Sequence, residues 1–338
     1  MVEKDDLQVK RKLASVQEIS EVKECEKDNN FEVCKVLGWQ VVAPKGLFKP
    51  KDLVVYFEID SKLPDERWCS AMEFYDYKVS TVTIAGELSQ GYIAHISEVF
   101  KKYEHLKIGD DLTEELSIEK YDDEEKVNDI IENSLFPVHV VPFTDEPRIQ
   151  SEPRYIELFK GKAYVATVKY DGTSGTYLLN PENKDELWAC YRNKLLNSKK
   201  KDDYWKMADK YKIKEKLQSY PDYALQCEIY GPGIQKNRLG IKDKSIAVFN
   251  VHSISQKRCL DYDEMVSVCE KLELPVVQLL ERGDSFKYTI DDLFEVVKGN
   301  YPETENQREG LVFRLANNWY SPQFRASFKI ISNDYLIK

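Results

Sequence analysis

Residues 163–172 read Ala-Tyr-Val-Ala-Thr-Val-Lys-Tyr-Asp-Gly, an apolar run that ends on a lysine, an acid and a glycine. The run from Ala163 to Lys169 is typical of a buried β-strand, and a lysine at its end projects from a rigid edge. Alone, the pattern K-x-D-G arises by chance in about one chain in ten of this length, and a charged hairpin turn would explain it. The segments downstream decide between a turn and a reactive site.

Four later segments place a carboxylate, an aromatic ring or a lysine inside an apolar strand. They are Cys227–Gly231, Val248–Val251, Glu309–Arg314 and Ser327–Ile330. A charge buried in such a strand is costly unless it faces a partner or a ligand. A lysine attacks phosphorus only as the free amine, so its pKa must be lowered by burial, neighbouring cations or a bound metal ion. A phosphate-binding cleft supplies all three.

The rest of the sequence divides into two patterns. From Val9 to Leu112, short strand-like segments alternate with turn residues, which predicts a small OB-like β-barrel. Later, strand-like residues 163–169, 176–179 and 246–251 alternate with helix-like residues 203–217 and 261–272, which predicts an α+β domain with antiparallel sheets and flanking helices. We therefore expect one domain over residues 1–115, an acidic linker over 116–143 and a second domain over 144–338.

Composition limits the protein class. The net charge of the 338 residues is −10, but residues 110–132 alone hold eleven acids and two lysines, so the remainder is nearly neutral and permits local basic grooves. The sequence lacks an apolar run of about eighteen residues and the features of a signal peptide, so we expect an intracellular protein. The seven cysteines form no C-x-x-C pair, which argues against a zinc site or a disulfide framework.

In order and spacing, the lysine segment and the four later segments resemble motifs I, III, IIIa, IV and V of the covalent nucleotidyltransferase superfamily of ATP-dependent ligases and capping enzymes. The chain also resembles one branch of it, the family-five RNA ligases with an N-terminal OB domain. The matching segments are Gly38–Val42, Val54–Ser61, Arg148–Gln150 and Gly231–Gln235. This resemblance implies an ATP-dependent RNA ligase that uses Mg²⁺ or Mn²⁺, with a nucleic-acid-binding OB-like domain before an adenylyltransferase (ligase) domain.

The resemblance implies a role for each matching residue. Lys169 would be the catalytic nucleophile, Lys329 would neutralise charge on the α-phosphate, and Glu309 would bind the metal directly or through water. Phe249 would stack on adenine, and Glu228 would accept a hydrogen bond from a ribose hydroxyl. The other nucleotide-binding residues would be Arg148, Ile149, Gln150, Val168, Arg192 and Asn193.

Each role has a plainer alternative. Phe249 also suits a core aromatic, since neighbouring strand residues point to opposite faces. Glu228 and Glu309 also suit structural salt bridges, and the two arginines and the asparagine of the set also suit ordinary surface positions. In the OB-like domain, Lys45, Lys49, Lys51 and Trp39 would form a nucleic-acid surface, unless the tryptophan belongs to the core.

Two positions depart from the family pattern. Cys227 replaces the glycine that usually precedes the motif III glutamate, which leaves the carboxylate in place. Ser327 replaces the first of the two motif V lysines. That change removes a phosphate contact unless Arg325 or Lys162 supplies it.

Three functions compete for these motifs: RNA ligation, DNA ligation or capping guanylyl transfer, and RNA binding without catalysis. DNA ligases and capping enzymes typically carry an arginine five residues after the nucleophile and an OB domain after motif V, whereas here Ser174 stands there and nine residues follow Lys329. A decayed enzyme would have lost at least one of the lysines or carboxylates assigned above, and Lys169, Glu228, Glu309 and Lys329 all remain. We expect a monomeric enzyme that joins the 3′-hydroxyl and 5′-phosphate ends of RNA through lysyl-AMP and adenylylated RNA, with a nicked duplex among its candidate substrates.

Overall fold

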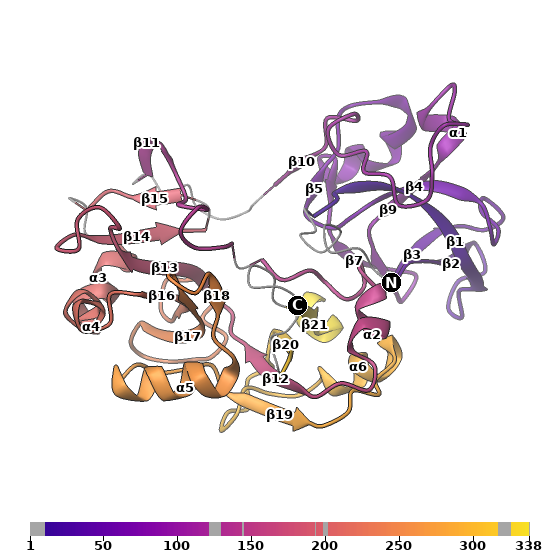
Figure 1. Cartoon of the computed structure of the whole chain (residues 1–338). Helices are drawn as coiled ribbons and strands as arrows, with labels where there is room; N and C mark the ends of the chain where they lie inside the picture. The colour runs from indigo at the N-terminus through magenta and orange to yellow at the C-terminus, as the bar shows by residue number, and fades with distance from the viewer. Residues whose placement is uncertain are drawn as a thin grey trace. The chain divides into compact units, whose positions relative to one another are not determined.

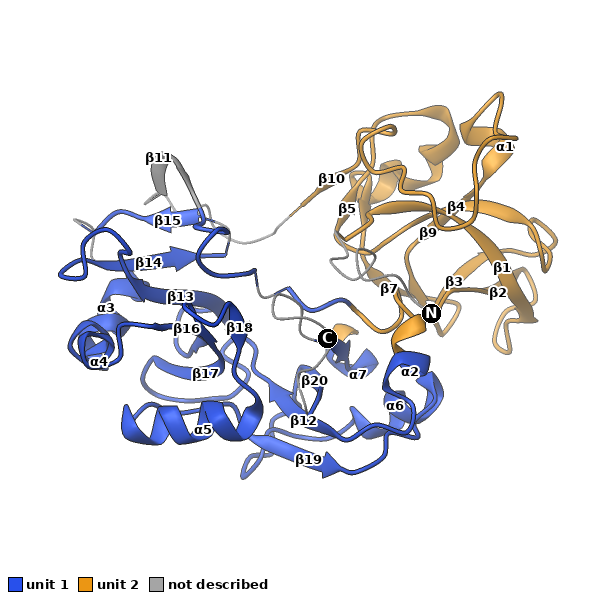
Figure 2. Ribbon diagram, in the orientation of Figure 1, with its two compact units in different colours: residues 1–8, 125–147, 156–335 blue, residues 9–124, 148–155, 336–338 orange. Residues whose placement is uncertain are grey.

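A computed structural model describes residues 11–121, 130–143, 145–192, 194–198, 202–316 and 326–337. The chain forms two compact units, coloured orange and blue in Figure 2. The N-terminal unit comprises residues 9–124, 148–155 and 336–338, and the C-terminal unit comprises residues 1–8, 125–147 and 156–335. The chain therefore returns to the N-terminal unit at residues 148–155 after it has entered the C-terminal one.

The N-terminal unit consists of short antiparallel strands with little helix (Figure 1). A five-stranded sheet has the order β3-β2-β1-β4-β9, beside a three-stranded sheet β10-β5-β6 and the hairpin β7-β8. The strands are β1 (Ala14–Glu24), β2 (Phe31–Val36), β3 (Trp39–Pro44), β4 (Leu53–Phe57), β5 (Ser61–Lys62), β6 (Lys78–Val79), β7 (Thr81–Ile84), β8 (Glu87–Gln90), β9 (Tyr92–His95) and β10 (Glu119–Lys120). A 3₁₀ segment covers Arg67–Tyr75, and the single-turn helix α1 covers Ile96–Val99.

Strand β1 organises this unit because its two halves pair with different strands. Ala14 to Glu18 pair with β4, while Ile19 to Glu24 pair with β2 across an irregularity between Ile19 and Glu21. Such a bulge bends and twists a strand, which lets one long strand serve both sides of a barrel. Two apolar clusters fill the unit, and Trp39, only 1% exposed, belongs to one of them.

The C-terminal unit contains two antiparallel sheets. The larger has the order β11-β15-β14-β13-β16-β17-β18 and the smaller has the order β19-β12-β20-β21. The strands are β11 (Ile130–Leu135), β12 (Tyr164–Lys169), β13 (Thr173–Leu179), β14 (Leu187–Tyr191), β15 (Lys194–Leu196), β16 (Tyr223–Tyr230), β17 (Ser245–Ser253), β18 (Arg258–Cys259), β19 (Leu279–Gly283), β20 (Gly310–Leu315) and β21 (Ser327–Ile331). The helices are α2 (Arg154–Phe159), α3 (Asp203–Lys210), α4 (Ile213–Ser219), α5 (Tyr262–Lys271), α6 (Ile290–Val296) and α7 (Asn333–Leu336).

Helices α3, α4 and α5 cover one face of the larger sheet. Their buried side chains share one apolar cluster with inward residues of β13, β16 and β17, such as Leu225, Cys227 and Val248. Since side chains alternate across a strand, Glu228 lies on the opposite face of β16 from Cys227. Residues 136–142 cover part of that face, which carries polar residues such as Glu228.

The predicted α+β class with antiparallel sheets is confirmed, and one helix differs from the expectation. Residues 203–217 form two helices rather than one, because Lys212 between them adopts a left-handed backbone with φ of 52°. The predicted helix over 261–272 corresponds to α5, which Asp261 and Glu264 begin with a reciprocal capping box. In the part of the chain that the structure describes, none of the helices has the length and apolar character to cross a membrane.

Candidate active site

Lys169 and Glu309 meet at the end of two paired strands. In the register of β12 and β20, Lys169 lies opposite Gly310, so Glu309 stands immediately beside the lysine. The Lys169 Nζ donates to both Glu309 carboxylate oxygens at 2.8 Å. Gly310 permits this arrangement, since an added Cβ there would lie 2.2 Å from the carbonyl oxygen of Ile330. The apolar strand that the sequence predicted therefore delivers its terminal lysine onto a carboxylate.

Lys329 lies on the same face of the smaller sheet. Thr167, Val312 and Lys329 form one cross-strand row, and Lys169 follows Thr167 by two residues, so all four side chains share a face. The Lys329 Nζ pairs with Asp145 at 2.6 Å, and Asp145 is 66% exposed. The face thus carries two lysines. Burial raises the pKa of Glu309 above its ordinary value, although the charges of Lys169 and Lys329 oppose this shift.

The charge state of Lys169 differs from the sequence-based expectation. Burial acts to lower its pKa, as expected, but the nearby carboxylates of Glu309, Glu228 and Asp171 outweigh burial and hold the pKa above its ordinary value. In the absence of ATP, Lys169 is therefore a charged ammonium rather than a nucleophilic amine. A change in the local charge must precede its reaction.

The turn after Lys169 packs tightly against β16. A Cβ at Gly172 would lie 2.3 Å from the carbonyl oxygen of Ile229 and 2.9 Å from Cγ of Glu228, so only glycine fits this approach. Asp171 is 5% exposed, and its Oδ2 has no hydrogen-bond partner in the described ranges. The K-x-D-G pattern thus encodes a close contact between the two sheets and places a second acid near Lys169.

Phe249 occupies a β-bulge. Gln226 lies opposite Asn250, whereas the next residue, Cys227, lies opposite Val248, so Phe249 is the extra residue on β17. The side chains on either side of it in the strand are buried, but Phe249 itself is partly exposed and belongs to none of the buried clusters. Bulges often redirect a side chain beside an active site, and the core-aromatic alternative does not fit this exposure.

Three other predicted nucleotide contacts, Val168, Arg192 and Asn193, belong to the C-terminal unit. Val168 is buried, and its N–H donates to the Gln278 carbonyl at 2.9 Å. Arg192 adopts a left-handed backbone with φ of 45°, and its guanidinium lies 5.4 Å from the ring centroid of Tyr191. Asn193 lies outside the described residues.

The surroundings of Ser327 show why a serine fits where the motif usually has its first lysine. Ser327 lies opposite Arg314, whose side chain is 2% exposed and pairs with Glu146 at 2.9 Å. Burying an arginine requires such a partner, and the small serine leaves room for it. Lys162 donates to the Leu158 carbonyl at 2.5 Å, and Arg325 lies outside the part of the chain that the structure describes.

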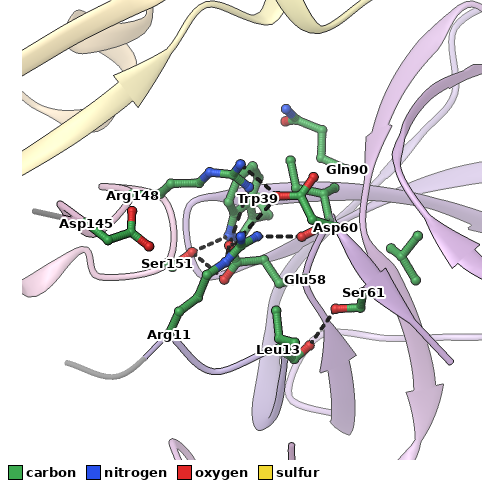
Figure 3. Close-up of polar contacts among 12 residues, drawn as sticks. Arg11, Leu13, Trp39, Glu58, Asp60, Ser61, Gln90, Asp145, Arg148 and Ser151 are labelled. Carbon is green, nitrogen blue, oxygen red and sulfur yellow. Dashed lines mark hydrogen bonds and ion pairs between the residues drawn. The ribbon is translucent and has the colours of Figure 1, made fainter. Parts of the chain in front are cut away.

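Arg148 belongs to the N-terminal unit, where two acids hold it (Figure 3). Its guanidinium lies 3.0 Å from Asp60 and 3.5 Å from Glu58, and Arg11 pairs with the same two acids. Although burial opposes ionisation, Arg148 and Arg11 hold the pKa of Asp60 below its ordinary value. Ser151 donates to Glu58 at 2.8 Å and accepts from the indole of Trp39 at 3.3 Å. Three segments that resembled the ligase branch, 38–42, 54–61 and 148–150, therefore meet at one cluster.

The two residues after Arg148 are fully buried. Ile149 and Gln150 are both 0% exposed, and the backbone carbonyl of Gln150 accepts from Gly38 at 2.9 Å. Neither the oxygen nor the nitrogen of the Gln150 side-chain amide has a hydrogen-bond partner among the described residues. A buried amide in this state is costly, which makes it a candidate ligand contact.

Two family models match the chain. One, described as RNA ligase, matches residues 162–331, which is half of the chain, and contains Lys169, Glu309 and Lys329. The chain belongs to the RNA ligase family. A second model, described as an OB-fold domain, matches residues 13–96 of this RNA ligase. The predicted resemblance to RNA ligases with an N-terminal OB domain is therefore confirmed.

Solved structures of Naegleria gruberi RNA ligase resemble this RNA ligase over almost its whole length. A lysine-to-alanine mutant with ATP and Mn is 30% identical, with a TM-score of 0.86 and coverage of 96% of this chain and 98% of that chain. The Naegleria ligase with PPi has the same identity and TM-score, with coverage of 97% and 98%. A sequence comparison with curated proteins gives no match.

Several residues beside the site escaped the sequence analysis. Burial and the charges of Glu309 and Asp171 raise the pKa of the Tyr335 phenol in α7, and the Arg238 guanidinium lies 3.8 Å from the centroid of the Tyr335 ring. Tyr301 contacts the backbone on both sides of the lysine–glutamate pair. Tyrosines in loops and single-turn helices carry no periodic signal, so a sequence pattern alone does not single them out.

Proposed function

We propose that this RNA ligase uses ATP to join RNA ends and that Lys169 carries AMP between the first and second steps. The observation that carries the proposal is the hydrogen-bonded pair of Lys169 and Glu309, with Lys329 on the same sheet face. A nucleophile, an acid and a second cation at one sheet end are the groups that phosphoryl transfer requires. Structures of the Naegleria ligase with ATP or AMP and Mn support the same substrate and metal here.

In the first step, the Lys169 nitrogen bonds to the α-phosphorus of ATP, and the bond from that phosphorus to pyrophosphate breaks. The two hydrogen bonds that Lys169 donates to Glu309 fix the direction of the attacking nitrogen, and Glu309 accepts the proton that the ammonium must lose. Lys329 offsets the charge that gathers on the α-phosphate. Its present partner Asp145 is mostly exposed, so a phosphate can replace that carboxylate at modest cost.

The later steps reuse the same groups. An oxygen of the RNA 5′-phosphate attacks the AMP phosphorus and releases Lys169, which forms adenylylated RNA. The 3′-hydroxyl then attacks the 5′-phosphate, and AMP leaves as the new phosphodiester forms. Lys169 makes a covalent bond only in the first two steps, so the third step depends on the remaining side chains.

The acids of the site suit Mg²⁺ or Mn²⁺, which prefer oxygen ligands. Glu309 is the residue we assign to the metal, directly or through water, and the unpartnered Oδ2 of Asp171 is a second oxygen nearby. No group of three acidic, cysteine or histidine side chains within the described ranges is placed to hold an ion alone, which fits a cation shared with phosphates and water. When bound, the cation offsets carboxylate charge and polarises the α-phosphate.

We also propose the residues that contact the bound nucleotide. The bulged, partly exposed Phe249 supports adenine stacking, and Glu228, whose carboxylate acts on Lys169 from the sheet face away from the helices, supports a ribose contact. The buried amide of Gln150 supports a polar contact with the nucleotide. The remaining proposed contacts are Arg148, Ile149, Val168, Arg192 and Asn193.

The finer properties of the enzyme are also proposals. We assign a 3′-hydroxyl and a 5′-phosphate as the ends that are joined, because lysyl-AMP chemistry activates a phosphate and not a hydroxyl. We also propose a monomer that works inside the cell. Seven free cysteines, six of them buried, support a reducing compartment.

Incubation with α-labelled ATP and Mn²⁺ tests the first step. We expect an acid-stable, hydroxylamine-sensitive adduct on Lys169 and weak labelling from GTP. Lys160→Met is a matched control, since Lys160 is 68% exposed in the same unit and should label normally. Equal labelling by GTP, or label that survives Lys169→Met, would contradict the proposal.

We propose that the OB-like domain expected over residues 1–115 helps to bind RNA. Trp39 is buried, so it is not available for base stacking as the sequence had suggested. Lys45, Lys49 and Lys51 are exposed, although Lys45 pairs with Glu24 at 2.8 Å. Phe74, at 90% exposure, is a better candidate for stacking than Trp39.

Phe74→Ala should weaken binding of nicked RNA by roughly tenfold, because stacking on one base contributes about 1–3 kcal/mol. Lysyl-AMP formation should not change. The control is Ile108→Ala, which removes another exposed apolar side chain of the same unit without a ring. Equal RNA affinities for Phe74→Ala and the wild type would exclude Phe74 from the RNA surface.

A further inference from the structure

A buried tyrosine joins the two strand ends that form the lysine–glutamate pair. Tyr301 is 2% exposed and lies in the connection between α6 and β20. Its hydroxyl oxygen accepts the backbone N–H of Asp171 at 3.1 Å and the backbone N–H of Glu309 at 3.2 Å. One oxygen therefore ties the end of β12 to the beginning of β20.

The connection that carries Tyr301 is itself firmly held. The Arg308 guanidinium donates three hydrogen bonds to carbonyls at the C-terminal end of α6, at 2.6, 3.0 and 2.6 Å. These carbonyls belong to Val296, Val297 and Lys298. Helix ends leave such carbonyls without partners, and a cation there is favourable. The backbone N–H of Tyr301 also donates to the backbone carbonyl of Asn306 at 2.8 Å, which holds the loop together on the other side of Tyr301.

Ring packing adds a second link between Tyr301 and the nucleophile strand. The Tyr170 ring lies edge-on to the Tyr301 ring, with centroids 6.0 Å apart. Tyr170 follows Lys169 directly, so Tyr301 contacts both residues that come after the lysine, Tyr170 through its ring and Asp171 through its N–H. These contacts reach the backbone and a neighbouring ring, and none of them requires ATP.

We propose that Tyr301 is a positioning residue, which sets the spacing of Lys169, Asp171 and Glu309 by holding two backbone N–H groups with one oxygen. The inference rests on the proposed function of Lys169 and Glu309. It holds that the distance between them is controlled by a residue outside every ligase-like motif. A buried N–H that loses its acceptor draws the backbone toward another partner. A shift of about 1 Å in a phosphoryl-transfer site is enough to slow the reaction about 100-fold.

Tyr301→Phe removes only the shared oxygen and keeps the ring. At saturating ATP we expect lysyl-AMP to form about 10- to 100-fold more slowly, with the ATP concentration for half-maximal rate changed by less than about threefold. Amide hydrogen exchange in the enzyme without ATP should become faster at Asp171 and at Glu309. A slower reaction without faster exchange at these two amides would overturn the positioning role, as would an unchanged rate.

Tyr177→Phe is the matched control. Tyr177 is fully buried in the same unit and donates to the backbone carbonyl of Tyr204 at 2.7 Å, so its variant also loses one buried phenol bond. It should lose thermal stability but form lysyl-AMP at the wild-type rate, and slowing equal to that of Tyr301→Phe would overturn the inference. If Tyr301→Phe does not fold, Arg308→Lys loosens the same loop with Tyr301 intact and should give the same exchange signature. If the wild-type enzyme forms no lysyl-AMP, the proposed function is rejected instead. The exchange measurement does not depend on that function, so the two failures can be told apart.

Discussion

Replacing Lys169 with methionine is expected to reduce lysyl-AMP formation and sealing of 5′-phosphate RNA by a factor on the order of 10⁴ or more. Methionine keeps the unbranched shape of the side chain and removes the nitrogen that bonds to phosphorus. Joining of pre-adenylylated RNA should persist at a measurable rate, because that step needs no covalent lysine. Gel assays with the two kinds of RNA give both rates.

The main risk in this experiment is a structural effect of the substitution. Without the ammonium, the carboxylates of Glu309, Glu228 and Asp171 lose the cation on which all three act. Thermal melting with and without Mn²⁺ measures this effect, and the surviving joining activity serves as an internal control for the fold. ATP-dependent sealing by the methionine variant at the wild-type rate would show that another residue is the nucleophile.

Glu309→Gln is expected to speed the chemical labelling of Lys169 and to slow the formation of lysyl-AMP. Burial favours the neutral amine of Lys169, but Glu309, Glu228 and Asp171 oppose it and raise the pKa. Removing the Glu309 charge lowers that pKa, so a larger fraction of Lys169 is free amine at pH 8. In metal-free buffer, an amine reagent should therefore label Lys169 several-fold faster in the variant than in the wild type.

The same variant should form lysyl-AMP about 100-fold more slowly with ATP and Mn²⁺, since the amide is a weak metal ligand and lacks the charge. Joining of pre-adenylylated RNA should fall as well. Glu157→Gln is the control, because Glu157 is a 73% exposed carboxylate of the same unit that pairs with Lys160. Slower reagent labelling of Lys169 in Glu309→Gln would show that this carboxylate does not set the charge state of the lysine.

The motifs that were visible in the sequence share one physical property. Lys169, Glu309 and Lys329 each interrupt or end a strongly apolar strand, and such strands have few alternative registers once one face is buried. The strand pattern therefore singled out these side chains as unusual, and the family resemblance implied that they share one site. Family resemblance added the expected partners, and pairing of β12 with β20 and of β20 with β21 is the arrangement that brings these residues together.

The remaining features depend on contacts between distant parts of the chain. The bulge at Phe249 arises from an offset between β16 and β17, which no local pattern in either strand reveals. Arg148 finds its acids about ninety residues earlier, and Tyr301 acts through one hydroxyl oxygen on two backbone groups. The raised pKa of Lys169 was also missed, because the sequence does not show how many carboxylates surround the amine.

The return of residues 148–155 to the N-terminal unit affects the order in which the protein can fold during synthesis. A nascent chain that ends before Arg148 has Glu58 and Asp60 with Arg11 as their cation, and it lacks the buried side chains of Ile149 and Tyr155. The barrel therefore becomes complete only after the ribosome has begun the ligase domain. Synthesis links the two units, although each has its own core. An early stop before residue 148 yields a barrel without Arg148.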